Sequence, residues 1–254
     1  MSKSVLTISH MGYGGKYPRN TLLSLRKAAD INADLAEIDV QLTKDHHFVL
    51  LHENDFSEHY SAGGRPSEMT LAEVRKIDAG VRCDPRYAGE KVPTLQEAFE
   101  CILNYPMNLC IEFKIKPEND PAEIAAYADR FFQASAFWGR FVINSFNRDF
   151  LALMKRRDNR YRILYDLNLK DMDYDIESLV AAAIRLQADG VEHPYAGLNE
   201  TAVYELHRNC LSVWVWTVNE REEIARMIDM SVDGILSDYP DRVIEVIHEK
   251  MLQD

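Results

Sequence analysis

Residues 35–52, LAEIDVQLTKDHHFVLLH, contain two apolar runs that are separated by a few polar residues. The first run, Leu35–Val40, and the second, Phe48–His52, lie too close together for a helical crossover, which needs a dozen or more residues. The sequence therefore predicts a tight turn at Thr43–His47, followed by an antiparallel return strand.

This hairpin also places polar side chains together. Glu37 and Asp39 are two residues apart, so they lie on the same face of their strand. The antiparallel return brings His52 back beside both carboxylates.

The rest of the chain alternates short apolar runs with helical patterns. Most of these runs are continuously apolar, as expected for parallel strands covered on both faces. Capping sequences that begin at Thr70, Thr94, Asp120 and Asn219 mark helix starts. The remaining predicted strands are Val5–His10, Leu109–Lys114, Phe141–Ser145, Arg162–Tyr165, Gly190–His193, Ser212–Thr217 and Gly234–Leu236.

Eight parallel strands with helices between them, in 254 residues, predict a single (β/α)8 barrel of the α/β class, known as a TIM barrel. Residues 53–92 hold loop signals and only one short helical pattern. We expect them to form a small cap insertion after the hairpin of the second strand. No repeat or low-complexity linker separates a second domain, so residues 1–254 are expected to be one domain.

Composition limits the partners and the compartment. The formal net charge of −12 disfavours nucleic acid and anionic membranes, while a small anionic substrate can still bind in one locally positive pocket. No apolar run is long enough for a signal peptide or a membrane span. The four cysteines form no C-x-x-C pair, which favours free thiols in the cytoplasm.

In such a barrel, functional groups stand at the carboxyl ends of the strands. The carboxylates of Glu37, Asp39 and Glu112 are expected there, and like charges of this kind require a cation. Oxygen ligands favour a hard divalent ion, Mg²⁺ or Ca²⁺. The other polar groups expected at this end are His10, His52 and Lys114.

These groups suit phosphoryl chemistry. A metal ion polarises a phosphoryl oxygen, and Lys114 adds positive charge. Two histidines, His10 and His52, can exchange a proton with the nucleophile and with the leaving group.

The chain resembles the glycerophosphodiester phosphodiesterase family of phospholipase-C-like barrels, in motifs that follow one another in order along nearly its whole length. These motifs are His10-Met11-Gly12, Pro18-Arg19-Asn20-Thr21, Glu37-Ile38-Asp39, His52-Glu53, Glu112-Phe113-Lys114, Ser145-Phe146, Trp216-Thr217-Val218-Asn219 and Asp233-Gly234-Ile235-Leu236-Ser237-Asp238-Tyr239-Pro240.

The resemblance implies metal-dependent hydrolysis of glycerophosphodiesters to glycerol 3-phosphate and an alcohol. In the family mechanism a glycerol hydroxyl attacks phosphorus, and water then opens the cyclic phosphate. The resemblance makes His10 and His52 the acid and base, in an order that the sequence leaves open. The implied metal ligands are Glu37, Asp39 and Glu112, and the implied substrate-binding residues are Lys114, Trp216 and Phe146.

Two departures from the family pattern concern the substrate. Met11 stands where the family has arginine, and Arg19 stands where it has glutamate. We interpret Arg19 as a relocated guanidinium that binds the substrate phosphate, although a changed substrate or lost activity would leave the same pattern. Glu53 also replaces the usual aspartate after His52.

Three functions therefore remain open: the glycerophosphodiesterase, a phosphodiesterase or cyclising lyase for another headgroup, and a non-catalytic phosphodiester-binding protein. The retained histidines argue against the last, because binding alone needs no proton transfer. Elsewhere, His193 is as compatible with loop packing as with substrate contact. Asp238, before Tyr239-Pro240, is expected to cap the last helix.

Overall fold

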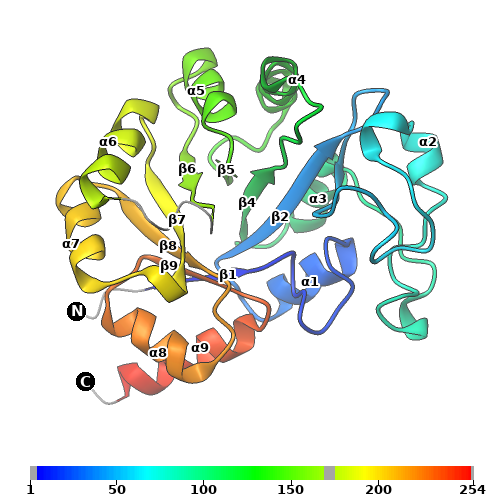
Figure 1. The fold of residues 1–254 in the computed structure, drawn as a ribbon. Helices are drawn as coiled ribbons and strands as arrows, with labels where there is room; N and C mark the ends of the chain where they lie inside the picture. The colour runs from blue at the N-terminus through cyan, green and yellow to red at the C-terminus, as the bar shows by residue number, and fades with distance from the viewer. Residues whose placement is uncertain (1–4, 169–174, 253–254) are drawn as a thin grey trace.

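A computed structural model describes residues 5–168 and 175–252. Eight parallel strands in the order β1-β9-β8-β7-β6-β5-β4-β2 close into a barrel through a pairing of β1 with β2, and helices surround them (Figure 1). The prediction of a (β/α)8 barrel is confirmed. The strands are β1 Leu6–Ser9, β2 Leu35–Leu42, β3 Phe48–Leu50, β4 Asn108–Phe113, β5 Phe141–Ser145, β6 Ile163–Asp166, β7 Gly190–Pro194, β8 Ser212–Trp216 and β9 Gly234–Ser237.

The helices between the strands begin largely where the sequence predicts. Thr94 accepts a hydrogen bond from the N–H of Glu97, and Asp120 accepts one from Ala122, so both residues cap their helices. The α-helices are α1 Leu22–Asp30, α2 Leu71–Val74, α3 Leu95–Ile102, α4 Pro121–Ala134, α5 Arg148–Arg157, α6 Ile176–Leu186, α7 Glu200–Arg208, α8 Arg221–Asp229 and α9 Pro240–Met251.

Two predicted helix caps are wrong. The N-cap of α8 is Glu220 rather than Asn219, and the N-cap of α9 is Tyr239 rather than Asp238. Asn219 and Asp238 instead hydrogen-bond to each other, from Nδ2 to Oδ2 over 2.9 Å. Both side chains therefore belong to the carboxyl end of the barrel.

The hairpin of β2 and β3 forms as predicted. Val40 pairs with Leu50 in antiparallel register, and the turn closes where Thr43 N–H donates to the carbonyl of His47. The return strand is shorter than expected, because β3 ends at Leu50. His52 follows in the chain after Leu51, whose N–H still bonds to the carbonyl of Asp39.

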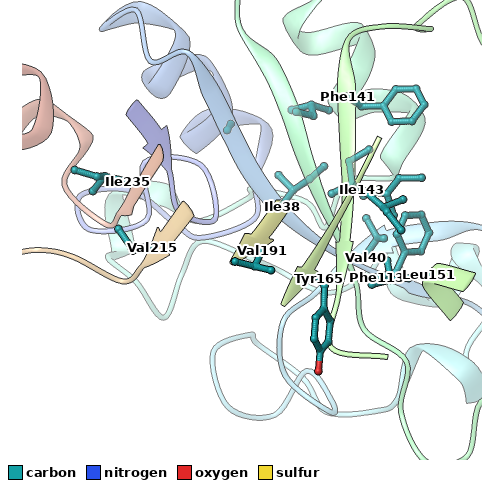
Figure 2. Packing of buried hydrophobic residues seen from close by; sticks show 14 of the residues in the cluster. Ile38, Val40, Phe113, Phe141, Ile143, Leu151, Tyr165, Val191, Val215 and Ile235 are labelled. Carbon is teal, nitrogen blue, oxygen red and sulfur yellow. The ribbon is translucent and has the colours of Figure 1, made fainter. Parts of the chain in front are cut away.

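Strand alternation separates the core from the site. Ile38 and Val40 of β2 pack toward the helices, in the layer shown in Figure 2, so Glu37 and Asp39 point into the barrel. An apolar cluster fills the barrel interior below these carboxylates. It contains Ile8, Leu35, Cys110, Leu164, Trp214 and Leu236.

Residues between β3 and α3 form the region expected to be a cap. They contain α2 and lie beyond β2, to one side of the helix ring (Figure 1). Phe56, Tyr60, Val74 and Ile77 are buried there in a small apolar cluster of their own. This cluster also takes in Val49 of β3, so the region packs directly onto the hairpin that carries His52.

Candidate active site

Three buried carboxylates meet at the carboxyl ends of β2 and β4. Asp39 pairs in register with Glu112, and Glu37 lies one layer lower on the same inward face of β2. Each side chain offers one oxygen, and these three atoms all lie within 4.8 Å of one another. The structure therefore brings together the three predicted metal ligands.

The ammonium of Lys114 lies beside this triad. Its Nζ is 3.0 Å from Asp39 Oδ1 and 2.5 Å from Glu112 Oε1. Burial alone would lower the pKa of Lys114, but the two carboxylates outweigh burial and raise it. Lys114 is thus held as a cation at the edge of the triad.

One ammonium cannot balance three carboxylates, and their pKa values diverge as a result. Burial, followed by repulsion from Asp39 and Glu112, raises the pKa of Glu37 well above its ordinary value. Burial also tends to raise the pKa of Asp39, but the charges of Lys114 and His52 lower it to about 2.

The loop after β1 positions two members of the triad. Met11 N–H donates to Glu37 Oε2 over 2.9 Å, and Asn20 Nδ2 donates to Asp39 Oδ2 over 2.8 Å. Gly12 has a φ of +71°, and a Cβ there would lie 2.3 Å from Ser24 Oγ. Glycine is therefore required where this loop packs against the start of α1.

His10 follows β1 and is oriented by a carboxylate. Its Nδ1 lies 2.9 Å from Asp238 Oδ1, and Asn219 holds Asp238 by accepting its backbone N–H and donating to its side chain. Burial would raise the pKa of Asp238, but its contact with His10 and the bond from Asn219 lower it to about 2. The Nδ1 of His10 is thereby occupied, and Nε2 is left for a ligand.

His52 has a looser carboxylate partner. Its Nδ1 lies 3.6 Å from Glu53 Oε1, and the same oxygen is 3.3 Å from His59 Nε2. The interaction with Glu53 raises the pKa of His52, and burial opposes it. The contact is an ion pair that favours the protonated imidazole.

A cavity of about 180 Å³ joins most of the predicted site residues. Phe146 and Trp216 form its aromatic side, with ring centroids 6.0 Å apart at 90°, and Lys114 Nζ lies 5.7 Å from the Phe146 ring centre. The lining residues are His10, Glu37, His52, Glu112, Lys114, Phe146, Asp166, Glu192, Trp216, Thr217 and Leu236.

Arg19 lies outside this cavity. It lines a neighbouring cavity of about 460 Å³, between the loop after β1 and the cap region, which Met11 and Glu53 also line. Its Nη2 is 3.9 Å from Asp238 Oδ1, the oxygen that contacts His10. Arg19 is therefore near the carboxylate that orients His10.

Sequence reasoning missed two buried acids of the site, Asp166 on β6 and Glu192 on β7. They pair in register and line the 180 Å³ cavity. A signal was present, since an acid within an apolar strand is unusual. His193, by contrast, is fully buried with Nδ1 2.7 Å from the carbonyl oxygen of Pro194, which fits loop packing.

The donor set fits a hard divalent cation. Glu37 Oε1, Asp39 Oδ1 and Glu112 Oε1 are all buried; among the described residues Glu37 Oε1 has no hydrogen-bond partner, while Asp39 Oδ1 and Glu112 Oε1 contact Lys114 Nζ. Three buried carboxylates with a single ammonium beside them carry negative charge that the protein does not balance, and such oxygens are the ligands that Mg²⁺ and Ca²⁺ prefer.

Comparisons with known proteins identify the family of this chain. Residues 10–242 match the glycerophosphoryl diester phosphodiesterase family. A glycerophosphodiester phosphodiesterase from Caldanaerobacter subterraneus subsp. tengcongensis is 31% identical over 250 residues, which are 96% of this chain and 98% of the relative.

Solved structures show the same architecture. A phosphodiesterase from Oleispira antarctica, in complex with the product sn-glycerol-3-phosphate, superposes with a TM-score of 0.88 at 25% identity and covers 96% of each chain. A glycerophosphodiester phosphodiesterase from Thermotoga maritima has the same fold, with a TM-score of 0.75 at 24% identity, over 96% of this chain and 99% of that one.

The barrel and its rim thus define a phosphodiesterase of the TIM-barrel class. The chain belongs to the glycerophosphoryl diester phosphodiesterase family. None of its described helices is long and apolar enough to cross a membrane.

Proposed function

We propose that this chain hydrolyses glycerophosphodiesters to glycerol 3-phosphate and an alcohol, with a divalent metal ion and a pair of histidines. The observation that carries the proposal is the convergence of Glu37, Glu112, Lys114 and both histidines on one cavity of about 180 Å³, with Asp39 in register beside Glu112. The product bound in the Oleispira antarctica phosphodiesterase is consistent with this reaction.

Glu37, Asp39 and Glu112 would hold Mg²⁺ or Ca²⁺. When bound, such an ion supplies charge that polarises a phosphoryl oxygen. Lys114, held between Asp39 and Glu112, would offer its ammonium to another phosphoryl oxygen of the substrate.

The two histidines would have different starting roles. With Asp238 on Nδ1, His10 presents the Nε2 lone pair, so His10 accepts the proton of the attacking hydroxyl. The ion pair with Glu53 keeps His52 protonated, and His52 donates a proton to the leaving oxygen. Their roles reverse when water opens a cyclic phosphate.

The remaining binding roles follow the cavities. Phe146 and Trp216 would pack against the carbon atoms of the substrate, since their rings form the apolar side of the smaller cavity. Arg19, in the larger cavity, would reach the phosphate or the leaving group from the side of His10.

The other expectations from the sequence complete the proposal. Residues 53–92 are a cap within one domain that spans residues 1–254. The partner is the small-molecule substrate, without nucleic acid or stable membrane insertion, and the compartment is the cytoplasm. The net charge of −12 supports the exclusion of nucleic acid and anionic membranes. The absence of a C-x-x-C pair supports the assignment to the cytoplasm.

The direct test is ³¹P NMR of a panel of glycerophosphodiesters, and of diesters without glycerol, with and without EDTA. We expect a glycerol 3-phosphate signal that disappears with EDTA. Accumulation of a cyclic phosphate would identify a cyclising lyase, and unchanged substrates would favour a non-catalytic binding protein. Turnover only of diesters without glycerol would indicate another headgroup class.

A further inference from the structure

The 180 Å³ cavity has a second acidic side that the proposed mechanism does not use. Asp166 and Glu192 are 3% and 1% exposed and occupy directly paired positions on β6 and β7. Neighbouring parallel strands are about 4.8 Å apart, so the two carboxyl groups extend side by side into the barrel. They line the same cavity as Glu112 and Lys114.

Hydrogen bonds distinguish the two acids. Glu192 Oε2 accepts from Asn144 Nδ2 over 2.6 Å, and its Oε1 lies 3.5 Å from Cys110 Sγ. Asp166 Oδ1 accepts from Trp216 Nε1 over 2.9 Å. The other oxygen of Asp166 accepts no hydrogen bond from any residue that the structure describes, so it is available to a ligand in the cavity.

The charges of the cavity determine the orientation in which a substrate binds. Lys114 and the proposed cation form a positive side, which attracts a phosphate. Asp166 and Glu192 form a side that repels it. Burial and the nearby acids raise the pKa of Asp166, and raise that of Glu192 to about 8. The pair therefore retains a proton near neutral pH and can both donate and accept hydrogen bonds.

A neutral hydroxyl suits this side better than a cationic headgroup. Lys114 Nζ already lies over the Phe146 ring, 5.7 Å from its centre, so this ring already has a cationic partner. A second cation in so small a cavity would be repelled by Lys114 and by the proposed metal ion. A hydroxyl brings no charge, and it can donate to the open oxygen of Asp166.

We propose that Asp166, supported by Glu192 and Trp216, binds the terminal hydroxyl of the glycerol moiety, remote from the phosphate, and thereby discriminates against diesters that lack this hydroxyl. This inference rests on the proposed function, since it assigns the retained glycerol to the smaller cavity. A diester without this hydroxyl would leave the open oxygen of Asp166 without a donor.

The test compares two substrates that differ in one hydroxyl: glycerophosphocholine and 2-hydroxypropyl phosphocholine, which lacks only the terminal hydroxyl. We expect the wild-type enzyme to prefer the first by about tenfold to a hundredfold in kcat/KM, the range for a hydrogen bond to a charged group. Asp166→Leu should abolish this preference by lowering kcat/KM for glycerophosphocholine alone. Asp166→Asn keeps an acceptor for Trp216 and should show an intermediate preference.

Binding separates this inference from the proposed reaction. Calorimetry with glycerol 3-phosphate and with its analogue that lacks the terminal hydroxyl needs no turnover. The wild-type protein should bind glycerol 3-phosphate more tightly by a similar factor, and Asp166→Leu should bind the two equally. Glu118→Gln, an exposed change, is the matched control and should keep the preference.

Three results would overturn the inference. They are equal wild-type affinity for the two ligands, an equal loss for both substrates in Asp166→Asn, and binding of free choline that depends on Asp166. If neither diester is hydrolysed but the difference in affinity persists, the proposed reaction fails while the hydroxyl site stands.

Discussion

His10 Nδ1 lies 2.9 Å from Asp238 Oδ1, across the junction between the first and the last strand of the barrel. This contact joins residues that are 228 positions apart in the sequence, and it exists only because β1 and β9 are neighbours in the closed sheet. Asn219 completes the arrangement, since it donates to the other oxygen of Asp238. Residues from the C-terminal part of the chain therefore orient the imidazole of His10, which lies near the N-terminus of the chain.

Asp238→Asn should lower kcat with little change in KM. The amide is as large as the carboxylate, but it cannot stabilise the imidazolium that forms when His10 accepts a proton. We expect a loss between roughly tenfold, as for hydrogen-bond partners of metal-binding histidines, and roughly 10⁴-fold, as for the aspartate of a serine-protease triad. Steady-state kinetics check this prediction. Asp241→Asn is the control, because Asp241 pairs with Lys16 rather than with a histidine, and it should remain active.

Glu53→Gln should move one limb of the pH–rate profile to lower pH. The interaction with Glu53 is the main cause of the raised pKa of His52, so its removal lowers that pKa. The shift to lower pH is expected whether His52 acts as the acid or as the base, because in both cases the limb reports the pKa of the same imidazole. Glu58→Gln is the control, because Glu58 lines the same cavity of about 460 Å³ as Glu53. Superimposable profiles for Glu53→Gln and wild type would show that Glu53 does not tune His52.

Glu112→Gln should weaken binding of Mg²⁺ or Ca²⁺ and remove activity together. The change replaces a buried carboxylate of the triad with a neutral amide, and hard cations prefer charged oxygen ligands. Calorimetry with each cation and the rate of hydrolysis should decline in parallel, each by at least about tenfold. Glu118→Gln should leave both unchanged. Activity of Glu112→Gln that persists after chelation would remove the metal from the mechanism.

Arg19→Ala should raise KM and lower kcat if its guanidinium contacts the substrate. Arg19→Lys should also be impaired, because lysine lacks the planar fork of donors that arginine offers to a phosphate. The double variant with Met11→Arg and Arg19→Glu, which has the family residue at both positions, should be more active than either single variant. Met11 is buried and its N–H already bonds to Glu37, so the single Met11→Arg change tests whether the loop accommodates the family residue. An Arg19→Ala enzyme with unaltered kinetics would leave phosphate binding to Lys114 and the metal.

The sequence predicted the site best where strand alternation decides the geometry. Glu37 and Asp39 are two apart on one strand, so their common face follows from the pleat. The residues that follow Asn219 and Asp238 are typical of a helix start, so the local sequence predicts that both residues cap helices. Only the closure of the barrel, which sets β1 beside β9, shows that Asp238 faces His10.

A strand boundary explains another omission. The run predicted to end at Tyr165 continues to Asp166, and that single residue is the one that enters the cavity. Glu192 lies inside a predicted strand, but its position beside Asp166 depends on the register between β6 and β7. Register across a parallel pair is set by long-range packing, so local sequence patterns do not supply it.

Glu192→Gln should stabilise the protein at alkaline pH and not at acid pH. Burial, followed by the charge of Glu112, raises the pKa of Glu192 from 4.5 to about 8. A carboxyl group with a raised folded-state pKa binds its proton more tightly in the folded state, so the stability it contributes is complete below pH 4.5 and is lost as the pH rises through 8. Glutamine fills the same space, accepts from Asn144 and does not titrate. With chelator present, the Tm of the variant should therefore equal or fall below that of the wild type at pH 5 and exceed it at pH 9, whereas Glu118→Gln should show no such crossover. A Tm difference that stays constant between the two pH values would mean that Glu192 titrates alike in the folded and unfolded chain.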